Sequence, residues 1–401
     1  MSRVLTGADR LAAEGAARLR GQRVGLVCNQ STVIHPSLEH LADLLHAAQG
    51  VELAALFAPE HGLRGEAQDM ESVGSTRDPV TGLPVHSLYG SDEDSLAPRA
   101  EDLEGLDRLV FDVQDIGTRY YTFAATLLLC MRRAAPLGLP VLVLDRPNPL
   151  GGGQVRGGTV APGFESFVGL YPVPVRHGLS VGELALWLQR ELVPECELEV
   201  LFCEGWRRAD YFDATGLTFV PPSPNMPTLD TAIVYPGQCL IEGTELSEGR
   251  GTTRPFELFG APGLDGHRLH AALRSEGGPA GRATLEGAVL REASFRPMFQ
   301  KHAGRTCGGL FLHVTDRERF DPFRFGLHLI HTVATCFPEV FAWREKAYEF
   351  VEEIPAIDLL TGSAAFREAV EAGRALDAIF AEQEEAEAAF RSAREAFLHY
   401  S

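Results

Sequence analysis

A series of short apolar runs, separated by helical patterns, restricts the fold of this chain more than any other feature. Between the runs, apolar residues recur at helical spacing, as Leu41, Leu44 and Leu45 do. Strands that are apolar on both faces and alternate with helices are typical of a parallel sheet covered on both sides. The pattern therefore predicts an α/β domain with a Rossmann-like, doubly wound parallel sheet. The runs are RVGLVC (23–28), VELAALF (51–57), RLVFDV (108–113) and PVLVLD (140–145).

The sequence predicts a second, smaller domain after a proline-rich segment. Residues 219–237, FVPPSPNMPTLDTAIVYPG, contain four prolines between positions 221 and 227, which exclude a continuous helix or a central strand there. Beyond them come short strand patterns such as TCGGLFLHV (306–314) and a charged tail with apolar residues at helical spacing. We predict a catalytic domain over residues 1–228 and a smaller α+β auxiliary domain over residues 229–401.

Polar and charged residues follow each of the four apolar runs. In doubly wound sheets, ligands bind beyond the carboxyl ends of the strands. Turn formation and helix capping explain Asn29 and Asn148, but they do not require a glutamate, a histidine and an arginine together. The pattern therefore predicts a shared polar cleft. Its candidate residues are Asn29, Gln30, Glu60, His61, Arg64, Gln114, Asp115, Arg119, Arg146 and Asn148.

The motifs of the common cofactors are missing from this sequence. It has no GxGxxG after the first strand and no GxxxxGK[ST], which disfavours a nicotinamide or ATP cofactor. It has no HExxH and no Cys/His cluster, so we predict neither a metal nor a cofactor. The segment GLSVG (178–182) matches a GxSxG nucleophile elbow, but Ser180 and Glu183 also form a capping box at the start of a helix, and we favour capping.

Composition narrows the partners and the compartment. A net charge of −19 argues against nucleic acid or an anionic membrane surface as a partner. The chain has no apolar run long enough for a membrane span, and its first residues lack a signal-peptide core. The seven cysteines are scattered without a CxxC, which is typical of reduced thiols. These features predict a cytoplasmic protein.

A glycine-rich segment in the second half carries charges of both signs. Residues 241–262, IEGTELSEGRGTTRPFELFGAP, are either a salt-bridged surface loop or a loop that closes over an anionic, hydroxyl-rich ligand. The sequence favours the two interpretations equally. The charged residues concerned are Glu242, Glu245, Glu248, Arg250 and Arg254.

Long motifs in a fixed order show that the sequence resembles the exo-β-N-acetylmuramidase NamZ family, from about Arg23 to past Gly362. The resemblance implies a Rossmann-like first domain, a smaller second domain and a cleft that accepts peptidoglycan fragments. The implied reaction is hydrolysis of a β-1,4 bond that releases N-acetylmuramic acid from the non-reducing end. The family's site includes the glutamate of its PEHG motif, here Glu60. The motifs are GLVCNQS, FAPEHGLRG, DPVTGLPVHSLYG, LVFDVQDIGTRYYTF, VLDRPNPLGG, RHGLSVGELA, PPSPNMPTLDTAIVYPGQCLIEGTELSEGRGTTRPFE and DPFRFGLHLI.

Residue chemistry and this resemblance together predict roles. Glycoside cleavage needs an acid that protonates the leaving oxygen, and we assign Glu60 to that task, oriented by His61 and Arg64. The second carboxylate is Asp112, Asp115 or a glutamate of the segment EGTELSEGRGT (242–252), unless the substrate's acetamido group makes it unnecessary. Arg119, Arg250 or Arg254 would bind the lactyl carboxylate, and Tyr120, Tyr121 and Trp206 are candidates for stacking on sugar rings. The predicted binding set also contains Asn29, Gln30, Gln114, Asn148 and Asn225.

Two other functions stay open at this stage. One is a different cell-wall hydrolase, an amidase or esterase, that uses the same cleft. The other is a non-catalytic muropeptide-binding protein. The partner predicted in every case is a muropeptide or amino-sugar ligand, and recycling of imported muropeptides agrees with a cytoplasmic location.

Overall fold

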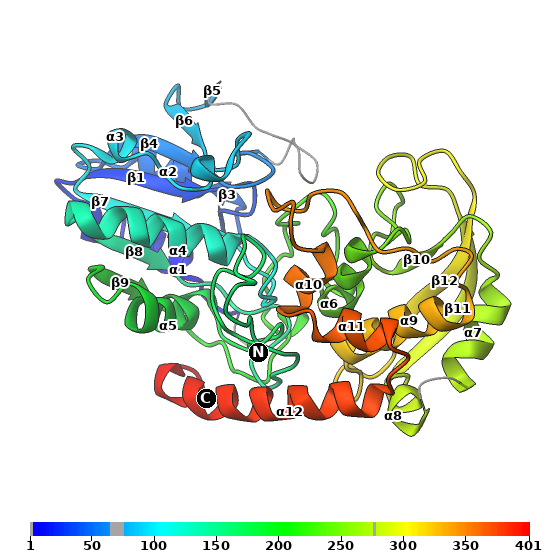
Figure 1. Ribbon diagram of the computed structural model, residues 1–401. Coiled ribbons are helices and arrows are strands. Elements are labelled where there is room, and N and C mark those ends of the chain that lie inside the picture. Colours follow the sequence, from blue (N-terminus) through cyan, green and yellow to red (C-terminus); the bar gives the residue numbers. More distant parts are fainter. Residues whose placement is uncertain (1–2, 65–75, 276–277) are drawn as a thin grey trace.

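A seven-stranded sheet forms the centre of the first lobe in the computed structural model, which describes residues 3–64, 76–275 and 278–401 (Figure 1). Its strand order is β5-β6-β4-β1-β7-β8-β9, and every neighbouring pair is parallel except β5 with β6. The parallel strands run outward in both directions from β1, the order of a doubly wound sheet. The strands are β1 Arg23–Cys28, β4 Glu52–Ala58, β5 Thr76–Arg77, β6 Pro84–Ser87, β7 Arg108–Asp112, β8 Val141–Leu144 and β9 Leu198–Leu201.

Helices cover both faces of this sheet, as predicted. Successive strand residues point to opposite faces, so Val110 packs in one apolar cluster and Phe111 in the other. Helices α1 (Gly7–Ala13) and α2 (Leu41–Ala47) cover the face of Val110. Helices α3 (Ala100–Leu103), α4 (Phe123–Ala134) and α5 (Val181–Leu192) cover the other face. Burial on both sides explains why the strands have near-continuous apolar sequences.

Ser180 is a helix cap. Its hydroxyl accepts a hydrogen bond from the Glu183 N–H at 3.2 Å, and its own N–H donates to the Glu183 carboxylate at 3.0 Å. This is the predicted capping box at the start of α5. The GLSVG segment is therefore explained by capping.

The second lobe contains an antiparallel sheet of three strands in the order β10-β12-β11, with helices around it. An α+β arrangement was predicted here, but residues 229–238 are a buried helix instead of part of a linker. Thr228 caps this helix by accepting from the Thr231 N–H at 3.2 Å. The elements are α6 Leu229–Gln238, η5 Cys239–Gly243, β10 Leu258–Ala261, α7 Gly266–Ser275, α8 Gly278–Ala283, β11 Ala288–Phe295, β12 Cys307–Val314, α9 Pro322–Cys336 and α10 Ala356–Thr361.

The end of the chain returns to the first lobe. Helices α11 (Ala365–Glu371) and α12 (Leu376–Ala393) form the predicted tail, and α12 runs beneath both lobes in Figure 1. Phe390 packs against Trp187 with ring centroids 6.4 Å apart, and one hydrophobic core extends through both lobes. The division after residue 228 stays a prediction. The remaining short elements are η1 Ala17–Leu19, β2 Val33–Ile34, β3 Glu39–His40, η2 Glu93–Leu96, η3 Ala135–Leu137, η4 Phe212–Ala214 and η6 Arg394–Phe397.

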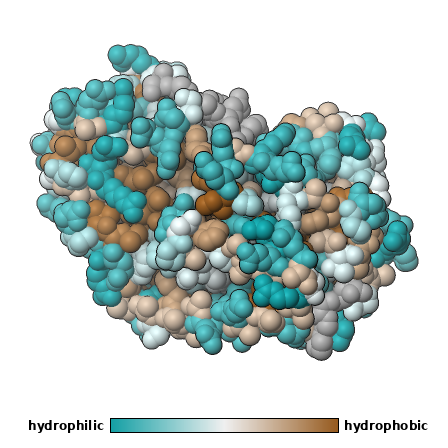
Figure 2. All heavy atoms as spheres, in the orientation of Figure 1, coloured by the Kyte–Doolittle hydropathy of each residue, from teal (hydrophilic) through white to brown (hydrophobic). Residues whose placement is uncertain are grey.

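The surface is indented where the two lobes meet (Figure 2). Within the described ranges, no helix combines the length and the apolar character that crossing a membrane requires. All seven cysteines are free thiols, and six of them are buried.

Candidate active site

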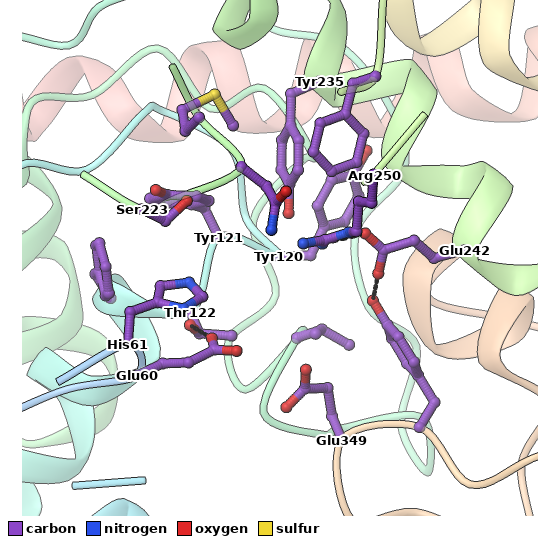
Figure 3. A pocket seen from close by; sticks show the side chains of 16 residues that line it. Glu60, His61, Tyr120, Tyr121, Thr122, Ser223, Tyr235, Glu242, Arg250 and Glu349 are labelled. Atoms are coloured by element: carbon purple, nitrogen blue, oxygen red, sulfur yellow. Dashed lines mark hydrogen bonds and ion pairs between the residues drawn. The ribbon is translucent and has the colours of Figure 1, made fainter. Parts of the chain in front are cut away.

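A pocket lies between the lobes, where the ends of β4 and β7 meet the second lobe (Figure 3). Both lobes supply side chains to it, and buried aromatic rings make up much of its wall. The described residues that line it are Glu60, His61, Tyr120, Tyr121, Thr122, Phe123, Val168, Ser223, Asn225, Met226, Tyr235, Glu242, Arg250, Phe256, Tyr348 and Glu349.

The turn after β4 brings Glu60 and His61 into the pocket. The Gly62 N–H donates to the Pro59 carbonyl at 3.1 Å, which closes the turn. His61 has a φ of +76°, a left-handed conformation that is uncommon for residues other than glycine. Both residues are 5% exposed, and the Glu60 carboxylate accepts from the Thr122 hydroxyl at 2.9 Å. Strain of this kind gathers at functional sites, which supports a role for the pair.

Aromatic rings pack at the junction of the two lobes. The Tyr121 ring meets those of Phe123 and Tyr235 edge-on, with centroids 5.0 Å and 5.7 Å away. Tyr120 donates its hydroxyl hydrogen to the Pro236 carbonyl. Burial raises the pKa of Tyr121 and Tyr235 well above the ordinary value, so both hydroxyls stay neutral. Such walls suit the apolar face of a sugar ring.

Glu242 is held as an ionised carboxylate. Arg250 donates to one of its oxygens at 2.6 Å and the Tyr348 hydroxyl to the other at 2.7 Å. Burial alone would raise the pKa of Glu242, but the Arg250 charge and these hydrogen bonds outweigh it and lower the pKa. A carboxylate with these partners is a poor proton donor, so Glu242 is suited to binding and to positioning Arg250.

A further buried carboxylate, Glu349, comes from a turn of the second lobe. It is 5% exposed and accepts from the Tyr89 hydroxyl at 3.1 Å. Its φ is +47°, so it also has a left-handed backbone. Figure 3 shows the Glu60 and Glu349 side chains pointing toward one another across the pocket.

Some of the predicted site residues come together in this pocket. They are Glu60, His61, Tyr120, Tyr121, Asn225, Glu242 and Arg250. Asn29 and Gln30 do not line the pocket. Their side-chain amides donate to the carbonyls of Pro222 and Pro221, respectively, both at 3.1 Å. These bonds tie the end of β1 to the segment that carries Ser223 and Asn225.

The structure places three of the predicted arginines outside the pocket lining. Arg64 pairs with Asp78 at 2.9 Å, and half-exposed Arg254 lies 3.5 Å from Glu257. Arg119 is fully buried and donates to three backbone carbonyls, and burial lowers its pKa to about 10. Arg250 is therefore the one predicted arginine that the described residues bring to the pocket.

Two carboxylates of the first lobe that were predicted for the site, Asp112 and Asp115, have partners outside the pocket. Asp112 accepts two hydrogen bonds from Arg146, at 2.6 and 2.8 Å, in a buried ion pair. Asp115 is not among the residues that line the pocket; it is buried and accepts from the Gly117 N–H, and burial raises its pKa to about 7. Neither is aimed into the pocket in the described structure.

Other predicted residues stabilise loops. Gln114 donates to the Pro147 carbonyl at 3.1 Å, and Asn148 donates to the Leu179 carbonyl at 3.0 Å. Glu248 pairs with Lys301 at 3.0 Å, whereas Glu245 is exposed beside the same lysine.

Trp206 packs against Tyr400 in a core cluster, with ring centroids 4.7 Å apart, so the expectation that it stacks on a sugar is wrong for this structure. The lining residues that sequence reasoning missed are Thr122, Phe123, Val168, Ser223, Met226, Tyr235, Phe256, Tyr348 and Glu349. Ser223 and Met226 lie within two residues of the predicted Asn225, so the same sequence segment could have indicated them. Tyr348 and Glu349 lie in a loop without periodicity, which offered no signal.

No group of three His, Cys, Asp or Glu side chains in the part of the chain that the structure describes is arranged to hold a metal ion.

Comparison with known proteins shows that the chain is similar to one protein family over nearly its whole length. The models for exo-beta-N-acetylmuramidase NamZ match it over residues 24–230 (N-terminal) and 233–400 (C-terminal). The peptidoglycan beta-N-acetylmuramidase NamZ of Bacillus subtilis (strain 168) is 42% identical over 398 residues, which are 99% of this chain and 92% of that protein.

Two DUF1343 family proteins from Bacteroides fragilis NCTC 9343 have similar crystal structures. The first has a TM-score of 0.87 at 31% identity, and the second a TM-score of 0.76 at 27% identity. Each comparison covers 100% of this chain and 99% of the other.

Proposed function

The chain belongs to the exo-β-N-acetylmuramidase NamZ family, and we propose that its pocket releases N-acetylmuramic acid from the non-reducing end of peptidoglycan fragments. The protein is a glycosidase of that family. The observation that carries the assignment to this pocket is Glu60, a buried carboxyl on a strained turn at the carboxyl edge of the parallel sheet. The pocket that it enters has aromatic walls and contains an arginine.

Glu60 acts first as the general acid. It gives its proton to the glycosidic oxygen while the bond from that oxygen to the anomeric carbon breaks, and the leaving sugar departs as a neutral alcohol. Water adds to the oxocarbenium-like centre and loses a proton, so that one water is consumed for each bond broken. The Thr122 hydroxyl, 2.9 Å from Glu60, orients the carboxyl, and His61 on the same turn shapes its surroundings.

Arg250 recognises the lactyl carboxylate that distinguishes N-acetylmuramic acid from N-acetylglucosamine. A guanidinium has five N–H donors and can bind more than one carboxylate, and Arg250 already pairs with Glu242 at 2.6 Å and lies 3.5 Å from Glu248. The Arg250 guanidinium also lies 5.0 Å from the centre of the Phe256 ring, which fixes its plane. A lactyl carboxylate bound by Arg250 would lie beside the aromatic wall.

The place of action that we propose is the cytoplasm, in recycling of cell-wall fragments. The support is chemical: all seven cysteines are free thiols, and proteins of oxidising compartments commonly pair theirs.

The experiment is release of free N-acetylmuramic acid from the disaccharide MurNAc-GlcNAc and from an aryl β-N-acetylmuramide, with and without EDTA. We expect release by the wild type with or without EDTA, and a fall of about 10²–10⁴ in kcat on the disaccharide for Glu60→Gln. Glu104→Gln, an exposed exchange of the same kind, is the matched control.

Binding of the disaccharide without any turnover would instead support a muropeptide-binding protein. Cleavage of an amide or ester bond, with the glycosidic bond left intact, would identify a different cell-wall hydrolase.

A further inference from the structure

We propose that Glu349 is the second catalytic carboxylate of this pocket, acting at the anomeric carbon while Glu60 acts at the leaving oxygen. This inference rests on the proposed glycosidase function of the same site. It assigns a role to a residue that no sequence pattern indicated.

The carboxyl groups of the pocket differ in their partners. The described lining contains three of them, Glu60, Glu242 and Glu349. Glu242 is bound by a guanidinium at 2.6 Å and by the Tyr348 hydroxyl, so its charge is already matched. The Thr122 hydroxyl donates to Glu60 at 2.9 Å and the Tyr89 hydroxyl donates to Glu349 at 3.1 Å, so a hydroxyl orients each of these two carboxyls. A carboxylate oriented in this way can still exchange a proton or stabilise a developing positive charge.

The backbone of Glu349 is unusual for its residue type. The N–H groups of Tyr348 and Val351 each donate to the other residue's carbonyl at 3.0 Å, which closes a tight turn around Glu349 and Phe350. Both central residues have positive φ, +47° and +69°, as in a type I′ turn, where asparagine and glycine are preferred. A glutamate and a phenylalanine in these places make the turn strained, and such strain is typical of segments that position functional side chains.

The first lobe holds this turn in place through Tyr89. The Tyr89 hydroxyl donates to Glu349 at 3.1 Å, and its ring packs edge-on against Phe350 with centroids 5.7 Å apart. Tyr89 follows β6, which pairs with β4, the strand that ends at the Glu60 turn. One sheet edge therefore positions both carboxyls, although they come from different lobes.

A substrate bound between the lobes would meet one carboxyl from each of them. Glu60 and Glu349 point toward one another in Figure 3, and both are buried. Cleavage with two carboxyls needs an acid for the leaving group and a carboxylate for the incoming nucleophile. Glu60 gives its proton to the leaving oxygen, and the Glu349 carboxylate takes a proton from the water that bonds to the anomeric carbon. Exchange with solvent then returns both groups to their starting states.

The two carboxyls should respond differently to the leaving group. An aryl leaving group of low pKa departs without protonation, so Glu60→Gln should retain much of its kcat on an aryl β-N-acetylmuramide and lose it on MurNAc-GlcNAc. Glu349→Gln should lose about 10²–10⁴ in kcat on both substrates, since both need the nucleophile. The KM of Glu349→Gln for both substrates should change by a much smaller factor than its kcat. Glu352→Gln, an exposed exchange in the same segment, is the matched control.

Further variants separate chemistry from folding. Glu349→Asp keeps the charge and should retain more kcat than Glu349→Gln, and both should melt within a few degrees of the wild type. A kcat for Glu349→Gln within tenfold of the wild type, or a loss that depends on the leaving group as for Glu60→Gln, overturns the inference. So does a loss confined to KM. If the wild type releases no N-acetylmuramic acid from either substrate, the proposed function itself fails, a result that the wild-type reaction alone reveals.

Discussion

Some of the buried charged residues that the structure describes are paired with an opposite charge and others are not. This difference determines how much a substitution at each of them should change the free energy of unfolding. Asp112 at the end of β7 and Arg146 after β8 form an ion pair that is almost completely buried. Removing one member of such a pair leaves the other charge without compensation inside the protein.

We expect Asp112→Asn to lower the free energy of unfolding by about 3–5 kcal/mol, as measured by urea denaturation. The exposed pair Arg190–Glu191 offers the control, because Glu191→Gln should change the same free energy by less than about 1 kcal/mol. An equal effect of the two substitutions would contradict the role given to burial.

His177 should make the protein less stable in acid. Burial, followed by the nearby charges of Arg394 and Arg119, lowers its pKa to about 3. The neutral ring accepts the Leu179 N–H at 3.1 Å through Nδ1. Because the unfolded chain binds a proton near pH 6.5 and the folded protein does not, this group destabilises the fold progressively as pH falls from about 6.5 toward 3.

His177→Asn keeps an acceptor for the Leu179 N–H and removes the titrating ring. We expect the free energy of unfolding to fall less between pH 7 and pH 4.5 in this variant than in the wild type. Comparing the two proteins cancels the opposing effect of Asp115 and Asp145, whose raised pKa values of about 7 and about 6 weaken the fold as pH rises. Parallel pH profiles for the two proteins would refute the assignment.

At the scale of elements, the crossing of α6 and α9 positions the wall of the pocket. The helices meet at Gly237 and Gly326, where an added Cβ would lie 1.6 Å from the Pro322 carbonyl oxygen and 2.3 Å from the Gly237 carbonyl oxygen, respectively. Tyr235, two residues before this contact, lines the pocket. Backbone contact between the helices therefore sets where that ring lies.

Gly237→Ala should force the two helices apart. We expect a loss of about 1–3 kcal/mol in the free energy of unfolding, together with a higher KM for the disaccharide because Tyr235 moves. Gly153→Ala, at a glycine with open space around it, should change stability by no more than about 0.5 kcal/mol. Normal stability in Gly237→Ala would mean that the crossing is not as tight as described.

At the scale of the whole molecule, the two lobes share one hydrophobic core, and the C-terminal helix α12 contacts both of them. Residues from β1 to η6 belong to a single hydrophobic cluster, and α12 connects the second lobe back to the first. At the end of the chain, the Tyr400 hydroxyl donates to Asp145 and accepts the Cys203 N–H at 2.7 Å. The lobes should therefore unfold together.

Tyr400→Phe tests this coupling. Scanning calorimetry should show one transition in the wild type, and one transition at a lower temperature in the variant, with a loss of about 1–3 kcal/mol because Asp145 and the Cys203 N–H lose a buried partner. Two resolved transitions, with only one of them shifted by the substitution, would show that the lobes unfold separately.

Local pattern was sufficient for four strands of the first lobe, β1, β4, β7 and β8, but it did not indicate β5, β6 or β9. The strands around the predicted runs, the doubly wound order and the α5 capping box follow from periodicity and from contacts a few residues apart. The helix at 229–238 was missed because its prolines resemble those of a linker, although only Pro236 lies inside it. Burial and the Thr228 cap outweigh the intrinsic preference against helix there.

Strand periodicity is enough to place a carboxylate and an imidazole, those of Glu60 and His61, at the carboxyl edge of a parallel sheet. Which distant residues join them depends on how the two lobes pack together. Arg119 turns inward to three carbonyls, Asp112 is matched by Arg146, and Glu349 arrives on a turn of the other lobe. Periodicity shows which residues of one helix or strand are buried. Contacts between the lobes depend on how whole elements pack against each other, and no local sequence pattern contains that information.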